Sequence, residues 1–311
     1  MVELRSDVDV SVVLPCYTEK RLESIRSALE SLRKQSVEPR QVVVAVDNNP
    51  ELADVLRKEF DWATVVVNEG GRGASATRNR GVDVVDTAIT AFLDDDETAD
   101  PDWLRELAAP FAESEVVGTG GTYEPAWETA KPAWFPDEFG WVVGGSYLGL
   151  PTVTAPIRNV WSGNMAVRTA EFRRVGGFRT DFGKQGAASQ PEDTDLCIRV
   201  GEASGKTWMY VPSAVILHQV PAARASFRFF VERCYSEGAG KAAMRSNLTG
   251  SAVQAEHGYV RDTALAALRR LAQLRVAAVV QGLVMVVGLA SAAAGYAGGL
   301  LDTVITKTRR W

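Results

Sequence analysis

Short apolar runs alternate with amphipathic segments through the first third of this chain. Residues 10–17, VSVVLPCY, form a continuous apolar run typical of strands that are buried on both faces of a parallel sheet. The next segment carries apolar residues at helical spacing, at Leu22, Ile25, Leu29 and Leu32. The expected strands are 10–17, 41–50, 63–71 and 87–96, and the expected helices are 21–35, 51–60 and 73–85. This alternation predicts an α/β fold with a parallel sheet and right-handed crossovers.

Polar residues gather where each expected strand ends. The clusters are Tyr17–Glu19, Asp47–Asn49, Asn68–Arg72 and Asp94–Asp96. In open parallel sheets, ligands bind beyond the carboxyl ends of the strands. We therefore expect all four clusters to line one crevice.

Three consecutive aspartates, Asp94 to Asp96, directly follow an apolar run. Asp94 and Asp96 are two residues apart, so both side chains would point to the same side of an extended backbone. Oxygen ligands of this kind suit Mg²⁺ or Mn²⁺, which commonly bind substrate phosphates as well. The alternative is a capped turn, with Asp100 as N-cap and Pro101 as the first helical residue. The two interpretations are compatible, because such a cap leaves the three aspartates free.

Composition favours a folded intracellular protein without a nucleic-acid partner. The chain has 311 residues, 46% of them apolar, and can hold one large domain or two modest ones. A net charge of −5 argues against binding to nucleic-acid phosphates. The three cysteines lack zinc-type spacing, and the first residues contain no apolar stretch of signal-peptide length. We therefore expect most of the chain to lie in the cytosol.

Residues 276–301 contain no charged side chain. At about 1.5 Å per residue, a helix of this length could cross a bilayer core of ~30 Å with tilt. The alternative is a pair of core helices rich in Ala and Gly. Basic residues on the two sides of the segment nearly balance, so the positive-inside rule gives no firm orientation.

Six segments occur in an order that resembles a known family. They are VSVVLPCYTE, VVVAVDNNP, GASATRNRG, AFLDDDETADPDWL, SGNMAVR followed by VGGF, and PEDTDLCIRV. Together they resemble family 2 of the inverting glycosyltransferases over residues 8–240, about three quarters of the chain. The resemblance implies the GT-A fold of nucleotide-diphospho-sugar transferases, with a mixed, mostly parallel sheet flanked by helices, followed here by a C-terminal apolar helical segment.

The resemblance also implies a division of the chain. A catalytic domain would occupy residues 1–240, with a nucleotide-sugar-binding half at 1–104 and an acceptor-binding half at 105–240. Amphipathic linker helices would occupy 241–275, a transmembrane or membrane-associated segment 276–301, and a basic tail 302–311.

By the resemblance, most of the donor site comes from the first half of the chain. The donor-binding residues would be Pro15, Tyr17, Glu19, Asp47, Gly73, Arg78, Asp94 and Asp95. Asp47 would accept the ring N–H of the base, typically uracil; the alternative is an Asx turn with Asn48 and Asn49. Gly73 and Arg78 would contact the diphosphate at a helix N-terminus, unless Arg78 is a surface arginine.

The implied metal ligands are Asp96, Asp94 and His218, and the metal would be Mg²⁺ or Mn²⁺. His218 ends an apolar segment at a position where many GT-A enzymes supply a metal or diphosphate ligand. The alternative is a structural histidine.

The segment PEDTDLCIRV carries the implied catalytic base. A sugar hydroxyl is a poor nucleophile, so a carboxylate must take its proton as it attacks the anomeric carbon. Asp193 matches the family's aspartate and Glu192 would lie beside the acceptor, although both could be ordinary first-turn acids of a helix. Asp195 and Arg199, four residues apart, are expected to form an ion pair. The remaining acceptor-binding residues would be Trp161, Gly163 and Asn164, unless Trp161 belongs to the core.

These features together predict a membrane-associated, metal-dependent enzyme that moves one sugar from a nucleotide-diphospho-sugar, with a UDP-sugar favoured. The Gln-X-X-Arg-Trp motif of processive synthases is missing, since the terminal KTRRW lacks the Gln. The acceptor would be a polyprenyl-phosphate or a lipid-linked glycan, and the catalytic domain would lie on the cytoplasmic side of the cell membrane. A homo-oligomer is possible. The alternatives are a non-catalytic sugar-nucleotide-binding subunit of a membrane glycan complex and a nucleotidyltransferase.

Overall fold

The computed structural model describes residues 8–181, 183–185, 188–190, 192–247, 254–273 and 275–308. The chain forms two compact units. Unit 1 comprises Met1–Glu124, Pro151–Gly183 and Glu192–His218, and unit 2 comprises Pro125–Leu150, Lys184–Pro191 and Gln219–Trp311. The functional halves expected at 1–104 and 105–240 stay a prediction, and the expected boundary at residue 240 falls inside a helix.

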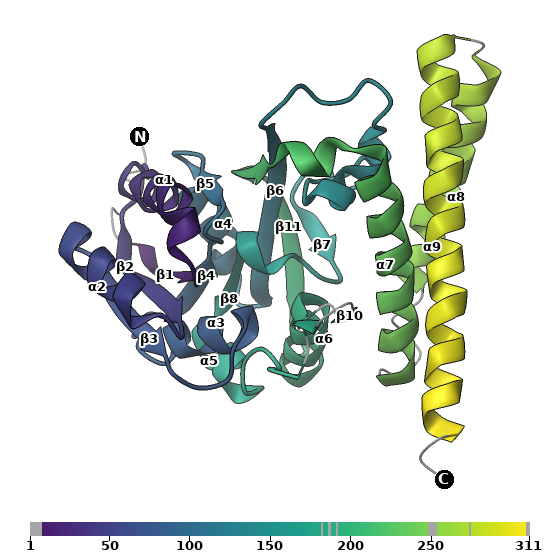
Figure 1. Cartoon of the computed structure of the whole chain (residues 1–311). Helices are drawn as coiled ribbons and strands as arrows, with labels where there is room; N and C mark the ends of the chain where they lie inside the picture. The colour runs from purple at the N-terminus through teal and green to yellow at the C-terminus, as the bar shows by residue number, and fades with distance from the viewer. Residues whose placement is uncertain are drawn as a thin grey trace. The chain divides into compact units, whose positions relative to one another are not determined.

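The centre of unit 1 is a mixed sheet with the strand order β3-β2-β1-β4-β8-β6-β11-β5, to which β7 adds by pairing with β11 (Figure 1). Strands β1 to β4 pair in parallel, and β8, β6, β5 and β7 enter through antiparallel pairs. The strands are β1 Val8–Cys16, β2 Pro39–Asp47, β3 Thr64–Asn68, β4 Ile89–Phe92, β5 Glu97–Ala99, β6 Val116–Trp127, β7 Ala155–Ile157, β8 Met165–Arg168 and β11 Thr207–Val220. The expected mixed sheet is confirmed, and its parallel part is formed by β1 to β4.

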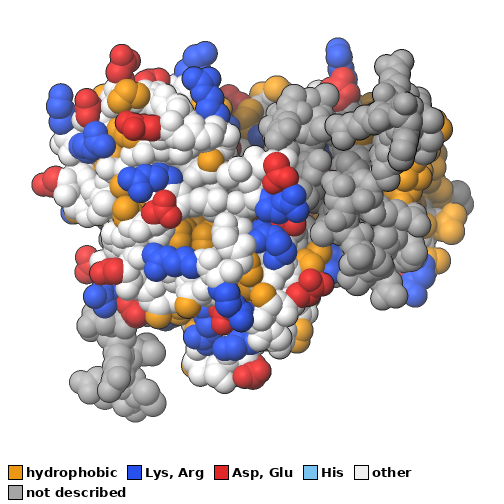
Figure 2. All heavy atoms as spheres, turned by 90° about the horizontal axis from the view of Figure 1, so that it is seen from below, with side chains coloured by type: hydrophobic (Ala, Val, Ile, Leu, Met, Phe, Trp, Pro, Cys, Tyr) orange, Lys and Arg blue, Asp and Glu red, His pale blue; other side chains and the backbone are white. Residues whose placement is uncertain are grey.

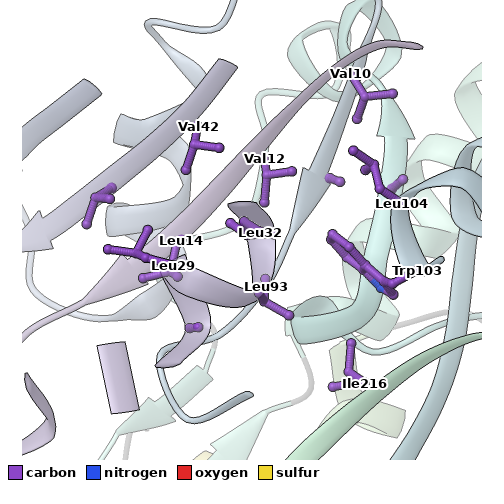
Figure 3. Close-up of a cluster of buried hydrophobic side chains, with 14 of the residues drawn as sticks. Val10, Val12, Leu14, Leu29, Leu32, Val42, Leu93, Trp103, Leu104 and Ile216 are labelled. Atoms are coloured by element: carbon purple, nitrogen blue, oxygen red, sulfur yellow. The ribbon is translucent and has the colours of Figure 1, made fainter. Parts of the chain in front are cut away.

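Helices cover both faces of this sheet. They are α1 Leu22–Arg33, α2 Pro50–Glu59, α3 Ala74–Val82, α4 Trp103–Ala108, α5 Thr169–Arg174 and α6 Glu192–Ser204, with short 3-10 turns η1 Glu19–Arg21, η2 Ala109–Ala112 and η4 Ser162–Asn164. Val12 and Leu14 of β1 pack with α1, α2 and α4 in one buried cluster (Figure 3). Val13 points to the other face and packs in a second cluster with α3, α5 and α6. Burial on both faces explains why the β1 run is continuously apolar.

The turn before α4 differs slightly from the expected one. Asp100 Oδ1 accepts a hydrogen bond of 3.0 Å from the Asp102 amide within the turn, but Asp100 is not the N-cap of α4, because that position is taken by Asp102. The helix itself begins at Trp103, which places Pro101 in the turn and not in the first helical position.

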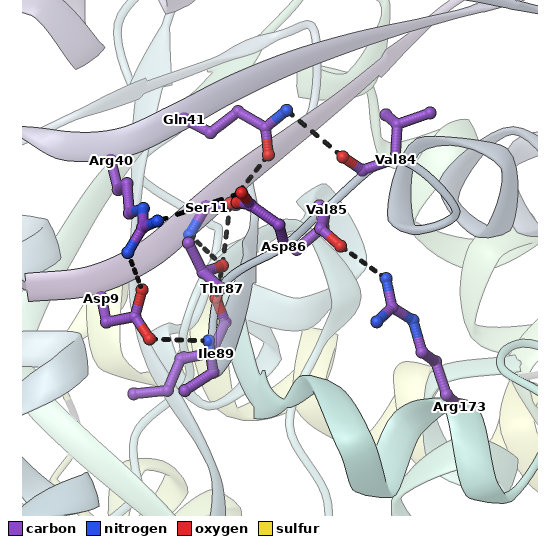
Figure 4. A network of polar contacts seen from close by, with 11 residues as sticks. Asp9, Ser11, Arg40, Gln41, Val84, Val85, Asp86, Thr87, Ile89 and Arg173 are labelled. Atoms are coloured by element: carbon purple, nitrogen blue, oxygen red, sulfur yellow. Dashed lines mark hydrogen bonds and ion pairs between the residues drawn. The ribbon is translucent and has the colours of Figure 1, made fainter.

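A polar network joins the amino ends of three parallel strands (Figure 4). The Ser11 amide donates to Thr87 Oγ1 at 3.0 Å, and Thr87 Oγ1 donates to Ser11 Oγ at 2.8 Å. Asp9 accepts from the Ala88 amide at 3.0 Å and pairs with Arg40 of β2 at 3.3 Å. These bonds link β1, β2 and β4 at their amino ends, whereas the loops described below follow the carboxyl ends.

On the face drawn in Figure 2, charged side chains of both signs are interspersed with apolar side chains. Several form pairs within one helix, such as Arg57 with Asp54 at 2.8 Å and Arg105 with Asp102 at 2.7 Å. Exposed pairs contribute roughly 0–1 kcal/mol each. The buried clusters on the two faces of the sheet therefore contribute most of the stability of unit 1.

Unit 2 is built mainly from three long helices, α7 Phe227–Asn247, α8 Gln254–Ala272 and α9 Val276–Thr308 (Figure 1). They pack with the 3-10 segment η3 Asp137–Val143 around Phe139, Phe230 and Met285. The remaining elements are η5 Ala222–Ala225 and a two-stranded sheet of β9 Gly183–Gln185 and β10 Ala188–Gln190. Within the described chain, one helix segment, Val276–Leu301, is long and apolar enough to cross a membrane, judged by length and composition.

Candidate active site

The expected polar clusters meet at the carboxyl ends of β1 to β4. Asp47 and Asn68 are the last residues of β2 and β3, and Asp94 follows β4. Because these strands are parallel neighbours, their ends share one edge of the sheet. Hydrogen bonds and ion pairs between the loops, described below, confirm the convergence predicted from the sequence.

Asp47 organises two of these loops. Its Oδ1 accepts from the side-chain amides of Asn48 at 2.9 Å and Asn68 at 3.1 Å, and its Oδ2 accepts from the Gly73 amide at 2.9 Å. Asn48 has a positive φ of 49°, the left-handed conformation that asparagine tolerates in turns. A carboxylate offers about four acceptor positions, so one remains for a further donor. Recognition of the base by Asp47 remains a prediction.

The loop that borders Asp47 is held by Asn49. Its Nδ2 donates to Glu19 Oε1 at 2.9 Å and to the Tyr17 carbonyl at 3.2 Å. The Glu19 backbone amide and Asn49 together lower the pKa of Glu19. The Tyr17 ring is 54% exposed, which leaves an aromatic face open to solvent. Pro15 is buried within β1 opposite Ala45, so its donor contact also remains a prediction.

Arg78 of α3 is a buried cation, and the alternative of a surface arginine is wrong. Its side chain is 4% exposed, its Nη2 contacts Asp94 Oδ1 at 2.5 Å, and its Nη1 lies 3.9 Å from Glu192 Oε1. Burial lowers the pKa of Arg78, but the attraction of Asp94 and Glu192 outweighs burial and raises it. Within the described residues, Nε and Nη1 have no hydrogen-bond partner. The structure thus holds a permanent positive charge with two unused buried donors.

Gly73 starts the helix that carries Arg78. It is the N-cap residue of α3 and has a φ of 115°, a conformation that favours glycine. No atom lies within 4 Å of the position that a Cβ would take there. The α3 N-terminus therefore presents backbone amides beside open space, as an anion site requires.

The second and third aspartates share a partner that the sequence did not indicate. Arg21 Nη1 contacts Asp95 Oδ1 at 2.5 Å and Asp96 Oδ2 at 3.3 Å. The guanidinium also lies 5.6 Å from the centre of the Tyr17 ring. Burial raises the pKa of Asp95 to about 6; Arg21 opposes this shift, and the negative charge of Asp96 adds to it. Arg21 therefore neutralises part of the aspartate cluster.

Two of the three expected metal ligands converge. His218 Nε2 lies 3.9 Å from Asp96 Oδ2, because His218 on β11 pairs with Glu97 on β5, one residue after Asp96. Asp94 instead pairs with Arg78. No group of three or more His, Cys, Asp or Glu side chains suitable for a metal occurs in the described parts of the chain. One carboxylate and one imidazole fit a cation that takes its other ligands from substrate phosphates and water.

Glu97 is a buried acid that sequence reasoning missed. It is 3% exposed, and its Oε2 accepts from the Asp94 amide at 2.8 Å. Burial, followed by the charges of Asp94 and Asp96, raises its pKa well above the ordinary value. A Cβ on Gly163 would lie 2.4 Å from Glu97 Oε1, so Gly163 permits this close approach. The signal in the sequence was a fourth acid directly after the three aspartates.

Asn164 and Trp161 are tied into the sheet. Asn164 is fully buried, accepts from Trp103 Nε1 at 2.8 Å and donates to the carbonyls of Thr122 and Ala214 at 3.0 and 3.1 Å. Trp161 packs edge-on against Tyr123, with ring centres 5.2 Å apart. These contacts position the loop around Gly163, and direct contact with an acceptor remains a prediction for both residues.

Glu192 and Asp193 lie in the first turn of α6. Asp193 Oδ1 accepts from the Thr194 amide at 2.7 Å. The pKa of the buried Tyr123 hydroxyl is raised by burial and then by the charges of Glu97, Asp94 and Asp193. The charge of Asp193 therefore acts on the same phenol as the charges of Glu97 and Asp94. The expected ion pair further along α6 is confirmed, with Arg199 Nη2 at 2.7 Å from Asp195 Oδ2.

The model of the family described as "Glycosyl transferase family 2" matches residues 11–176. The chain belongs to this family. It is 32% identical over 310 residues to the glucosyl-dolichyl phosphate glucuronosyltransferase of Haloferax volcanii, covering 96% of this chain and 99% of the relative. It is also 28% identical over 228 residues to the succinoglycan biosynthesis protein ExoM of Rhizobium meliloti, covering 70% of each.

Two solved structures share the fold of this family 2 chain. The mannosyltransferase PcManGT from Pyrobaculum calidifontis, in complex with GDP-Man and Mn²⁺, superposes with a TM-score of 0.58 at 17% identity, covering 93% of this chain and 86% of that one. GalNAc-T7 with UDP, GalNAc and Mn²⁺ gives a TM-score of 0.53 at 14% identity, covering 81% and 54%. The protein is therefore a glycosyltransferase with the GT-A fold, as the sequence motifs predicted.

Proposed function

We propose that this glycosyltransferase moves one sugar, with inversion at the anomeric carbon, from a nucleotide-diphospho-sugar to a hydroxyl of a polyprenyl-phosphate-linked acceptor. The observation that carries the proposal is Arg78, a buried cation on α3 whose Nε and Nη1 have no hydrogen-bond partner among the residues that the structure describes. A buried guanidinium with free donors suits a diphosphate, which it can bind through paired hydrogen bonds. Asp47, if it accepts the ring N–H of uracil, favours a UDP-sugar.

The proposed acceptor rests on the similarity to the Haloferax volcanii glucuronosyltransferase. That relative is named as a glucuronosyltransferase that acts on glucosyl-dolichyl phosphate, and this chain aligns with 99% of its length. We infer a dolichyl- or polyprenyl-phosphate-linked acceptor for this chain too. The apolar segment of α9 supports a location at the cell membrane. We further propose that the catalytic domain lies on the cytoplasmic side.

In the proposed reaction, Asp193 takes the proton of the acceptor hydroxyl as its oxygen bonds to the anomeric carbon. The bond from that carbon to the diphosphate oxygen breaks on the opposite face, and its electron pair leaves with the nucleoside diphosphate. Arg78 and the α3 N-terminus bind the charge that develops there. The Thr194 amide, by its hydrogen bond, orients the Asp193 carboxylate for the transfer.

Asp96 and His218 are the residues that would hold a divalent cation. When bound, Mg²⁺ or Mn²⁺ would neutralise charge on the departing diphosphate. The Mn²⁺ in both superposed structures supports the use of a divalent cation.

The test is a transfer assay on the full chain in detergent. Mg²⁺ or Mn²⁺, a panel of UDP- and GDP-sugars and a polyprenyl-phosphate-linked acceptor are supplied, and nucleoside diphosphate release and the anomeric configuration of the product are measured. We expect a single inverted linkage from one donor, and loss of turnover in Asp193→Asn with donor binding retained. Wild-type turnover in Asp193→Asn, or a retained configuration, contradicts the mechanism. If no nucleoside diphosphate is released with any donor, the result favours a non-catalytic sugar-nucleotide-binding subunit.

A further inference from the structure

Helix α9 exposes one continuous apolar strip over Val276–Leu301. The exposed residues recur every three or four positions: Val276, Ala277, Val280, Leu283, Val286, Val287, Ala290, Ala293, Ala294, Ala297, Leu300 and Leu301. The strip covers 26 residues, which at ~1.5 Å per residue is about 39 Å of helix. An exposed apolar surface of this length marks a site of interaction with another apolar phase.

The opposite side of α9 packs against helices that carry charged side chains. Near its start, Arg270 of α8 pairs with Glu138 at 2.8 Å and lies 2.9 Å from the sulfur of Met285 on α9. Gln281 of α9 donates to the Ala133 carbonyl at 2.9 Å. Charged and polar groups therefore lie beside the first half of the apolar segment.

The second half of α9 lies beside α7. A Cβ on Gly295 would lie 1.9 Å from the Tyr235 carbonyl oxygen, and one on Gly299 would lie 3.0 Å from the Ala239 carbonyl oxygen. The same stretch of α7 carries a network in which Arg233 and Lys241 contact Glu237 at 3.0 and 3.8 Å. If α9 crossed a bilayer, these charges would lie at the depth of the acyl chains, where charged side chains are costly.

We propose that α9 lies in the plane of one membrane leaflet and does not cross the bilayer. This inference rests on the proposed lipid-linked acceptor. The apolar strip of α9 faces the acyl chains, and the charged side chains of α7 and η3 lie on the aqueous side of the leaflet. Arg275 is exposed directly before the strip, Arg269 is exposed on the preceding helix α8, and Lys307, Arg309 and Arg310 follow the end of the strip in the sequence. Basic residues at both ends suit the anionic head groups of a lipid surface.

Flotation with phospholipid vesicles tests whether the apolar strip of α9 binds a lipid surface. The full chain is mixed with neutral or anionic phospholipid vesicles, and the bound fraction is compared with that of Leu283→Glu/Val287→Glu, two exposed positions on the strip. Val55→Glu is the matched control, because Val55 is an exposed apolar residue on α2 in unit 1. We expect stronger binding to anionic vesicles and at least a tenfold loss in the strip variant alone. Unchanged vesicle binding of the strip variant overturns the proposal. It is also overturned if light scattering shows that the strip variant has lost self-association while its vesicle binding is retained, because the strip would then join two copies of the chain.

Cysteine labelling tests the topology. Val276→Cys and Leu301→Cys place one exposed thiol at each end of the strip, and native Cys16, Cys197 and Cys234 are all buried. In sealed membrane vesicles, both new thiols should react with an impermeant maleimide from the same side. Reaction from opposite sides shows that α9 crosses the bilayer and overturns the proposal. Nucleoside diphosphate release in detergent reports the proposed function separately, because that assay requires no membrane.

Discussion

At the scale of single residues, a substitution of Arg78 can separate the contribution of its charge from that of its hydrogen-bond donors. Arg78→Lys keeps a positive charge beside Asp94 but removes the planar donors that lack a partner among the described residues. We expect kcat/KM to fall about 10²-fold or more, the typical effect of losing one preorganised donor. The melting temperature should change little. Arg80→Lys, on the same helix with a side chain that is 42% exposed, is the control. Steady-state kinetics that match between the two variants would remove Arg78 from the site.

Asp95 gives the site a pH dependence in metal-free buffer. Its pKa is raised from 3.8 to about 6 in the folded protein, so the folded state binds the proton more tightly than the unfolded state. The free energy of unfolding should therefore fall as pH rises through this window, by an upper limit of about 3 kcal/mol. Asp95→Asn should flatten this part of the curve in urea titrations with chelator present. A curve of unchanged slope in the variant would assign the pH effect to another group.

At the scale of elements, strand β5 and the η4 turn are joined through Glu97 and Gly163. Gly163→Ala would place a methyl group 2.4 Å from Glu97 Oε1. We expect a loss of about 1–3 kcal/mol in stability, the usual cost of overpacking, together with reduced turnover. Gly258→Ala is the control, because no atom lies within 4 Å of its Cβ position. The double variant Gly163→Ala/Glu97→Asp should recover part of the loss in urea unfolding. Strictly additive effects would show that the two residues do not press on each other.

Pattern and resemblance predicted the order of elements and the gathering of polar residues at the carboxyl ends of the strands, but not the contacts among those residues. Strand length and helical spacing are local properties, so β1 to β4 and their helices could be located from the sequence. Arg21 reaches Asp95 across 74 positions, and His218 reaches Asp96 only through the pairing of β11 with β5. No local pattern encodes such contacts. Arg78 likewise packs against Phe178, 100 positions later in the chain, whose ring centre lies 5.5 Å from its guanidinium.

At the scale of the whole molecule, every proposed donor, metal and base residue lies in unit 1, whereas the apolar helix lies in unit 2. Unit 2 has its own buried cluster around Phe139, Phe230 and Met285. Donor binding and action on a lipid-linked acceptor should therefore be separable by a change in unit 2 alone.

Gly295→Val tests this separation. A Cβ at Gly295 would lie 1.9 Å from the Tyr235 carbonyl oxygen, and backbone cannot yield as a side-chain tip can, so α7 and α9 must move apart. Ala297→Val, on the exposed side of the same helix, is the control. We expect Gly295→Val to lose transfer to the lipid-linked acceptor. Nucleoside diphosphate binding, measured by calorimetry, should stay within about twofold of wild type, which corresponds to less than ~0.4 kcal/mol, because the donor residues lie in unit 1. Loss of nucleotide binding in Gly295→Val would mean that unit 1 depends on unit 2 for its fold.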